Sequence, residues 1–276
     1  MLNSNNLDLN FLAQNKHKSY QENTPFSNIY FDDFFDHDYL TEVLSEFPDL
    51  SNYNSNNYKS NVEKNKFLAE GEKFYGQKTK QLLHYLNSEP FLKFLQILTG
   101  IEEELIPDPH YSGGGFHETK KGGLLKLHAD FNKHPKTNLD RRVNVLIYLN
   151  KDWDDSYGGD FELWDKEVKN CVKKFKPIFN RIAIFSTTDF SYHGHPDPLN
   201  CPENKSRKSI ALYYYSNGRP EIEVNSGLEN HSTLFVKRSD NKNDQKDFNK
   251  LGYKGLIKLF LPPILLQIFN KNKCKY

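Results

Sequence analysis

The spacing of the apolar residues changes once along the chain, close to residue 100. Before that point, residues 39–47 follow helical spacing, and the pattern ends at Pro48. A second helical stretch surrounds residues 82–86. A third begins after Ser88, a residue type that favours the N-cap position, and ends at Gly100. The pattern predicts three short amphipathic helices that pack on the back of a sheet.

Beyond residue 100 the pattern of apolar and polar residues is different. Short runs with strand character alternate with clusters of Gly, Asn, Asp and Pro, which is typical of an antiparallel sandwich or barrel. The predicted fold is therefore mainly β with flanking helices. The predicted strands are 123–130, 142–149, 160–164, 168–175, 181–186 and 207–215.

The two ends of the chain lack both patterns. Residues 1–25 are rich in Asn, Gln, Lys and Ser without apolar periodicity, so we expect a flexible leader. Residues 254–271 are apolar but are interrupted by Pro262-Pro263, which predicts two short helical pieces that pack against the domain. Their flanking lysines make this segment the one candidate for membrane contact. The expected divisions are a leader (1–25), helical support (26–104), a β core (105–220) and a C-terminal extension (221–276).

Composition and charge narrow the class of protein. Fourteen per cent of the 276 residues are aromatic, enough for one well-filled core. Lys plus Arg (37) balances Asp plus Glu (36), so no overall field would attract nucleic acid. The three cysteines have neither zinc-site nor disulfide spacing, and the N-terminus has no signal-peptide pattern. A cytoplasmic location is expected.

One triplet has the spacing of a metal site. In His128-Ala129-Asp130 the first and third side chains point to the same side of a strand and can reach one ion. A second triplet, His195-Pro196-Asp197, contains a proline and leads into a Pro-rich run, so a ladder strand is improbable there. The first triplet is therefore the predicted one. Two imidazoles and one carboxylate on one face suit a non-haem Fe(II) oxygenase.

The remaining candidates follow later in the chain. The predicted strand 181–186 leads after a short loop to His193, which is a candidate third ligand. In the next strand Arg207 and Ser209 share a face, and a guanidinium fork beside a hydroxyl is suited to bind a carboxylate. Taken singly, each of these residues has an ordinary structural role as its better explanation. As an ordered set on strands, they favour a site.

This set resembles the iron and 2-oxoglutarate signature of the Fe(II)/2-oxoglutarate-dependent dioxygenases. The run 147–153 (IYLNKDW) followed by Gly158-Gly159 is similar to the hypoxia-inducible factor prolyl hydroxylases and their bacterial prolyl 4-hydroxylase-like relatives. The resemblance covers about 105–216. It implies a double-stranded β-helix (jelly-roll, cupin-like) core, Fe(II), 2-oxoglutarate and O2, with ascorbate as a candidate reductant. The implied reaction hydroxylates a C–H bond and releases succinate and CO2.

The resemblance also assigns site residues. It implies that His128, Asp130 and His193 bind the metal, and that Arg207, Ser209 and Tyr148 bind the cosubstrate, with Asn144 on the same face as Tyr148 as a weaker candidate. Arg207 lies fourteen residues after His193, farther than the family spacing, because the intervening loop is enlarged. That loop leaves His195 as an alternative distal ligand. Otherwise His195 lines the mouth of the site, as His117 is also expected to do.

The substrate stays open at this point. A prolyl residue of a peptide or protein, or an amino-acid-like target, is favoured by the resemblance. The same chemistry on a small molecule, a lipid or a sugar is the alternative, and a peptide would need an open groove. A non-catalytic metal-binding barrel of the cupin type, with the C-terminal segment as a docking element, is the third hypothesis. Arg207 argues against it, because such a barrel needs no carboxylate anchor. The oligomeric state is not predicted.

Overall fold

The computed structural model describes residues 1–52, 56–223, 230–239 and 241–249. The chain divides into two compact units, residues 1–236 and 237–276. In the described part of the chain, twelve strands form one sheet in which every pairing between strands is antiparallel. All of these strands belong to the first unit, which therefore contains the whole described sheet.

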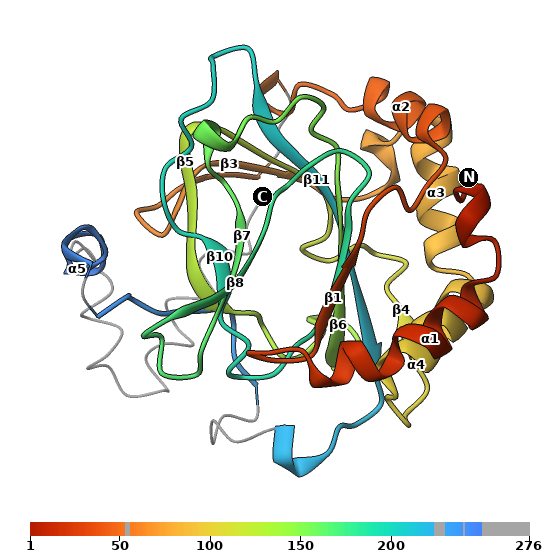
Figure 1. Cartoon of the computed structure of the whole chain (residues 1–276). Helices are drawn as coiled ribbons and strands as arrows, with labels where there is room; N and C mark the ends of the chain where they lie inside the picture. Colours follow the sequence, from red (N-terminus) through yellow and green to blue (C-terminus); the bar gives the residue numbers. More distant parts are fainter. Residues whose placement is uncertain (53–55, 224–229, 240, 250–276) are drawn as a thin grey trace. The chain divides into compact units, whose positions relative to one another are not determined.

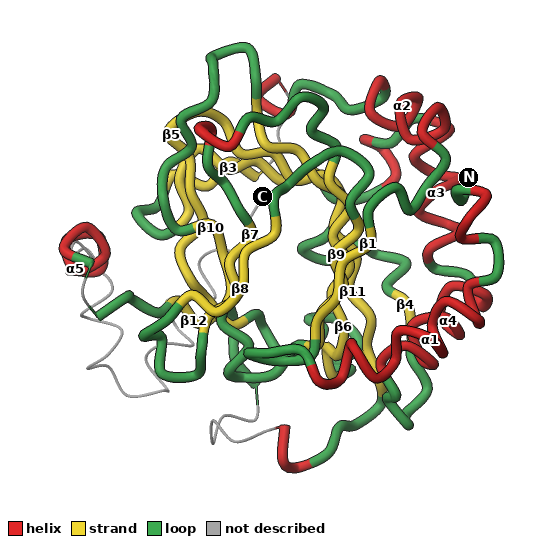
Figure 2. Tube along the Cα trace, in the orientation of Figure 1, coloured by secondary structure: helices red, strands yellow, loops and turns green. Residues whose placement is uncertain are grey.

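The strand order explains the shape of this sheet. It runs β1-β9-β6-β11-β5-β10-β7-β8, and β3, β4 and β12 pair with strands inside this path. Figure 2 shows β1, β9, β6 and β11 facing β5, β10, β7 and β8 across an interior. The bounds are β1 (Asn28–Phe31), β2 (Asn56–Lys59), β3 (Glu63–Ala69), β4 (Ile106–Pro107), β5 (Gly115–Ala129), β6 (Asp140–Tyr148), β7 (Phe161–Trp164), β8 (Cys171–Phe175), β9 (Ile182–Ser186), β10 (His193–His195), β11 (Ser206–Ser216) and β12 (Leu234–Phe235). The predicted double-stranded β-helix is confirmed.

Four helices of this unit cover the outer face of one wall. They are α1 (Leu9–Glu22), α2 (His37–Ser45), α3 (Gln77–Leu86) and α4 (Glu89–Thr99), and Figure 1 shows them beside β1, β6 and β11. The three predicted helices are thus confirmed. Ser88 occupies the N-cap of α4, but its hydroxyl donates to the carbonyl of Tyr85 instead of capping. Gly100 ends α4 with φ +68°, a left-handed conformation that glycine adopts without steric cost.

Alternation along the strands separates the helix-covered core from the interior. Residues 143, 145 and 147 of β6 and residues 182 and 184 of β9 are apolar and belong to the cluster that packs under the helices. Their neighbours Tyr148, Ala183 and Phe185 belong to a second cluster inside the barrel. Because successive strand residues face opposite sides, the same strands supply the core and line the interior.

The expectation of a flexible leader over residues 1–25 is wrong. Residues 9–22 form α1, whose start is capped by the Asp8 carboxylate, which accepts from the backbone N–H of Phe11 at 2.9 Å. Leu9, Ala13 and Tyr20 are buried, and α1 packs against α4. Three buried residues in fourteen suffice to fix a helix on an existing core, although they give too weak a periodicity to stand out among Asn and Lys.

The strands β1, β2 and β3 were not expected within the helical support, and β10 was not expected at all. β1 extends one edge of the sheet, and β3 pairs with the bent β5. The predicted strand 123–130 is only the second half of β5, which begins at Gly115. The helical-support and extension boundaries stay predictions, although the chain divides at residue 236 rather than at 220.

The described part of the second unit contains α5 (Lys242–Asn249), and Asp244 of this helix forms an ion pair with Arg238 (Nε to Oδ2, 2.9 Å). The predicted helical pieces at 254–271 lie outside the described residues. Among the residues that are described, none of the helices is both long and apolar enough to cross a bilayer.

Candidate metal centre and its cavity

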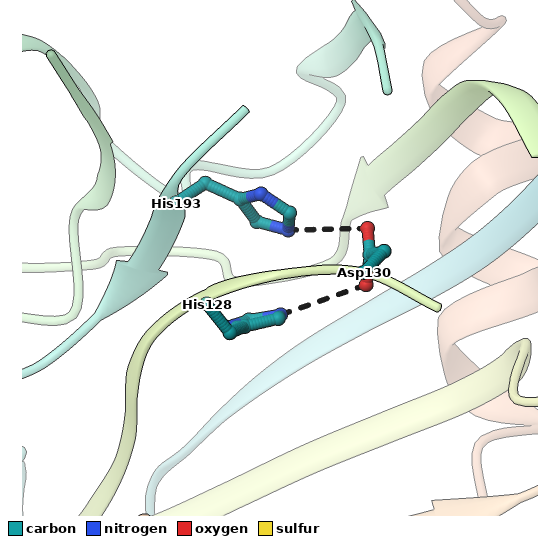
Figure 3. A group of neighbouring side chains, drawn as sticks. All are labelled: His128, Asp130 and His193. Atoms are coloured by element: carbon teal, nitrogen blue, oxygen red, sulfur yellow. Dashed lines mark ion pairs between the residues drawn. The ribbon is translucent and has the colours of Figure 1, made fainter. Parts of the chain in front are cut away.

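Two neighbouring strands bring three candidate ligands together. In the ladder between β5 and β10, His193 lies opposite His128, and Asp130 directly follows the end of β5. Nε2 of His128 lies 3.6 Å from Oδ1 of Asp130, and Nε2 of His193 lies 3.4 Å from Oδ2. Figure 3 shows both rings turned toward the carboxylate. The three ligand atoms lie within 4.8 Å of one another, close enough to bind one ion.

Backbone carbonyls orient both imidazoles. Nδ1 of His128 lies 2.9 Å from the carbonyl oxygen of Lys126, and Nδ1 of His193 lies 2.8 Å from that of Ser191. Each Nδ1–H therefore donates to the backbone, which leaves the lone pair of each Nε2 directed at Asp130. Burial lowers the pKa of His193 to about 4, so its ring is neutral at pH 7. Neutral rings are the form in which histidine binds a metal.

The third ligand, Asp130, is held by two side chains of β6. Its Oδ2 accepts from Nδ2 of Asn144 at 2.8 Å and lies 3.1 Å from Nη2 of Arg141. Burial alone would raise the pKa of Asp130, but the positive charge of the Arg141 guanidinium holds it well below its usual range. The carboxylate is thus charged and oriented. Two histidines and one carboxylate on one face are the donor set that suits Fe(II) in oxygenases.

Arg141 is itself fixed by aromatic rings. Its guanidinium carbon lies 3.4 Å from the ring centre of Tyr213 and 4.4 Å from that of Phe131, and the residue is 1% exposed. Its Nε donates to Oδ1 of Asn144 at 2.9 Å. Asn144 thus has protein partners at both ends of its amide. Its predicted contact with the cosubstrate stays a prediction, and the contacts seen here are with Asp130 and Arg141.

The three ligands line a cavity of about 270 Å³. Most of the other residues singled out from the sequence line it too, from β5, β6, β10 and β11. They are His117, Asn144, His195, Arg207 and Ser209. Tyr148 lies outside the lining but within reach of Arg207. One cavity therefore collects residues that are up to 170 positions apart in the sequence (63 and 233).

Arg207 is a buried cation without an acidic partner. It is 6% exposed, its Nε donates to the carbonyl of Gly159 at 2.7 Å, and its Nη2 lies 3.5 Å from the hydroxyl of Tyr148. Within the described residues, no carboxylate lies within ion-pair distance of it. A buried charge is costly unless an opposite charge accompanies it. The geometry therefore fits an anionic ligand, with Ser209 beside it on β11.

Gly159 makes room for this arginine. A Cβ at this position would lie 2.5 Å from Leu199 Cδ2 and 3.1 Å from Arg207 Cδ, and the backbone φ is +79°. A side chain there would push Arg207 away from the carbonyl that orients it. The Gly158-Gly159 pair of the sequence thus has a direct role in the cavity.

The two remaining histidines both line the cavity. Only His195 is buried, so its expected place at the mouth is wrong, whereas that of the half-buried His117 stays a prediction. His195 is 4% exposed because β10 continues through it before Pro196 ends the strand. Asp197 is exposed, so the second triplet forms no metal group. Nε2 of His117 lies 3.0 Å from the carbonyl oxygen of Gly113, and burial lowers the pKa of His117 to about 3.

Several cavity residues were not found from the sequence. Arg141 lies one residue before the predicted strand. It pairs with Asp130 because β6 lies beside the segment that follows β5, and this arrangement cannot be inferred from the sequence. Thr233 lines the cavity and Phe235 stacks on His128 with ring centres 5.4 Å apart. Phe235 belongs to β12 and Thr233 directly precedes this strand, which at two residues is too short for a strand signal. The one signal in the sequence that could have identified Arg141 is its position as a charged residue at the start of an apolar strand.

Comparison with known proteins gives one family and several structures of the same fold. Residues 114–215 match the model of the 2OG-Fe(II) oxygenase superfamily. A Trichoplax adhaerens prolyl hydroxylase, solved with a hypoxia-inducible factor oxygen degradation domain peptide fragment, is similar at TM-score 0.57 and 22% identity, covering 78% of this chain and 94% of that one. A Pseudomonas putida prolyl-4-hydroxylase is similar at TM-score 0.54 and 14% identity (75% and 100%). The α-ketoglutarate-dependent epimerase SnoN from nogalamycin biosynthesis is similar at TM-score 0.51 and 11% identity (83% and 97%).

Proposed function

We propose, on the premise that this chain is a 2OG-Fe(II) oxygenase, that it hydroxylates a prolyl residue of a peptide or protein. One observation in this structure supports the premise. The same cavity is lined by the triad His128, Asp130 and His193 and by the buried Arg207, which has no acidic partner among the described residues. A metal and a carboxylate can therefore be bound side by side.

Different residues of the cavity would bind the metal and the cosubstrate. His128, Asp130 and His193 would hold Fe(II), and Arg207 with Tyr148 and Ser209 would hold the distal carboxylate of 2-oxoglutarate. When bound, Fe(II) and 2-oxoglutarate supply the oxidising chemistry, in which O2 is consumed, succinate and CO2 leave, and a C–H bond is hydroxylated. The protein orients the reactants, and its buried cavity excludes water.

Two features support a peptide substrate. The similar Trichoplax adhaerens enzyme was solved with a peptide fragment. In this chain the aromatic rings of Tyr213 and Phe131 line the cavity beside Arg141, which offers an apolar surface next to a hydrogen-bond donor. A prolyl ring and the carbonyl groups of a peptide need such neighbours.

The two described cysteines are unpaired, which supports the proposed cytoplasmic location.

The first experiment tests the metal and cosubstrate sites. Purified protein is incubated with Fe(II) and 2-oxoglutarate without O2, the visible absorption of the chelate is recorded, and succinate is quantified after O2 is admitted. We expect wild type to give both signals and Asp130→Ala to give neither. Asp197→Ala is the matched control, because Asp197 is exposed and is not among the residues that line the cavity. Absence of the band in metal-loaded wild type would exclude the oxygenase function.

The second experiment tests the substrate. Proline-containing peptides are offered to the active enzyme, and a mass increase of one oxygen is located by fragmentation. Hydroxyproline in a peptide, with succinate formed in equal amount, is the expected result. Succinate formation that responds only to small molecules would replace the peptide by a metabolite substrate.

A further inference from the structure

His195 lies beside the metal centre, one step along the same strand. It follows His193 by two residues on β10, a rise of roughly 6.6 Å for a β-strand. In the ladder with β5, His193 lies opposite His128, whereas His195 lies opposite Leu125, nearer the start of β5. Since both His193 and His195 line the cavity, His195 marks the direction in which the cavity extends away from the metal ligands.

Arg207 reaches the same end of the cavity from the same edge of β5, because β3 occupies the opposite edge at both positions. It lies opposite Thr119 in the ladder between β11 and β5. Thr119 and Leu125 are six residues apart in β5, yet β3 pairs with them through Lys66 and Glu63, which are only three residues apart.

The chain between Thr119 and Leu125 therefore bulges out of the sheet. At Gly123, a Cβ would lie 2.6 Å from Thr119 Cγ2, which shows how tightly this bulge closes. The bulge brings the strand positions opposite His195 and Arg207 together, and both side chains line the cavity.

The ring of His195 has a buried nitrogen that bonds to nothing in the described part of the chain. His128 and His193 each use Nδ1 to bond a backbone carbonyl two residues earlier. His117 bonds the carbonyl of Gly113. Nδ1 of His195 has no such partner, although the residue is 4% exposed. An unsatisfied buried polar atom is unfavourable, which indicates that a partner is supplied from outside the chain.

We propose that His195 donates a hydrogen bond to the distal carboxylate of bound 2-oxoglutarate, beside Arg207. The inference rests on the proposed function and assigns one further cosubstrate-binding residue to its site. The distance covered by two residues of a strand is comparable with the length of a five-carbon diacid. A molecule that binds the metal through one end therefore places its other carboxylate near His195 and Arg207. A carboxylate offers about four acceptor positions, so it can accept from both side chains. The site would then select dicarboxylates more strongly than one arginine alone can.

The test measures cosubstrate binding without turnover. Fe(II)-loaded protein is titrated anaerobically with 2-oxoglutarate and, separately, with 2-oxopentanoate, which has a methyl group in place of the distal carboxylate. The chelate absorption gives both dissociation constants. His195→Leu removes the donor at similar size, His195→Gln keeps an N–H donor, and His110→Leu changes an exposed histidine.

We expect His195→Leu to weaken 2-oxoglutarate binding by about 10- to 100-fold, the usual loss for a hydrogen bond to a charged group. Binding of 2-oxopentanoate should stay within about twofold of wild type. His195→Gln should recover part of the affinity, and His110→Leu should match wild type. The KM for 2-oxoglutarate should rise more than kcat falls in the leucine variant.

Three results would overturn the inference. Unchanged 2-oxoglutarate affinity in the leucine variant would show that His195 makes no such bond. An equal loss for both ligands would show that it shapes the cavity or the metal centre instead. Failure of wild type itself to bind 2-oxoglutarate would remove the proposed function as well, which distinguishes the two failures. If His195→Leu does not fold, the ratio of the two affinities in His195→Gln and His195→Asn decides, and a wild-type ratio in both would contradict the inference.

Discussion

At the scale of single residues, the amide of Asn144 connects the metal ligand Asp130 to the buried Arg141. It donates to the carboxylate at 2.8 Å and accepts from the guanidinium at 2.9 Å. Partners that orient a ligand in this way commonly contribute 10- to 100-fold to metal affinity. We therefore expect Asn144→Ala to weaken Mn(II) or Fe(II) binding by about that factor, measured by titrating protein that contains no 2-oxoglutarate.

Asn150 provides the control for this substitution. Its amide is equally buried, but it bonds the carbonyls of Pro177 and Lys208 away from the cavity. Asn150→Ala should therefore lower the free energy of unfolding by about 1–3 kcal/mol and leave the metal affinity of the folded protein unchanged. If both variants lose metal affinity to the same degree, the contact between Asn144 and Asp130 does not orient the ligand.

The same residues show what a sequence can reveal about a site. His128 and Asp130 are two positions apart on one strand, and Arg207 and Ser209 likewise, so the period of a strand was enough to group them. The pairing of Arg141 with Asp130 depends on where β6 lies relative to β5, and no local spacing encodes that. The triplet 195–197 was not predicted to lie on a ladder strand because it contains a proline, yet the ladder continues up to that proline.

At the scale of elements, helix α1 is anchored to the barrel by a partly buried hydrogen bond. The hydroxyls of Tyr20 and of Ser186 on β9 lie 2.8 Å apart, and Tyr20 is fully buried. Tyr20→Phe leaves the ring in place and removes the bond, so we expect a loss of about 1 kcal/mol in the free energy of unfolding. Tyr30→Phe is the control, because Tyr30 is 40% exposed. Equal stability of the two variants in urea would contradict this role.

Helix α3 begins without a side chain of its own to cap it. Gly76 occupies the N-cap, and the carboxylate of Glu46, just after α2, accepts from the backbone N–H groups of Lys78 and Thr79 at 2.9 and 2.8 Å. A Cβ on Gly76 would lie 2.3 Å from the Glu46 carboxyl carbon, so the glycine makes room for this cap. We expect Glu46→Ala to lower the free energy of unfolding by about 0.5–2 kcal/mol, as other lost N-caps do.

The cap also predicts a pH dependence. Burial would raise the pKa of Glu46, but the hydrogen bonds from Lys78 and Thr79 outweigh it and lower the pKa. A lowered pKa in the folded protein means that the contribution is complete above the unfolded value, about 4.3, and is lost as the pH falls through the folded value. The difference between wild type and Glu46→Ala in urea should therefore shrink below about pH 4. Glu42→Ala, which removes a half-exposed ion pair with Lys78, should change little at any pH.

At the scale of the whole molecule, the residue pattern of the sequence predicted the main strands of the barrel, but it did not predict the short strands that pair with them. Alternating runs between Gly, Asn and Pro clusters predicted strands whose residues belong to β5, β6, β7, β8, β9 and β11. The short strands β10 and β12 have three and two residues, too few for a period to be visible. The strand β3 pairs with the edge of β5 that β10 and β11 leave free, and that free edge is a property of the assembled sheet.

The division of the chain at residue 236 carries the last prediction. The triad, the cavity lining and every described strand lie within residues 1–236, including β12, which pairs with β5 at His128 and Ala129. A chain shortened to residues 1–236 should therefore fold and bind Fe(II) and 2-oxoglutarate within about twofold of the full chain, since it keeps every described residue that lines the cavity. Anaerobic titration of the chelate band measures both. A large loss of either affinity would show that residues 237–276 complete the site. Unchanged affinities with slower peptide hydroxylation would instead assign this segment to substrate docking.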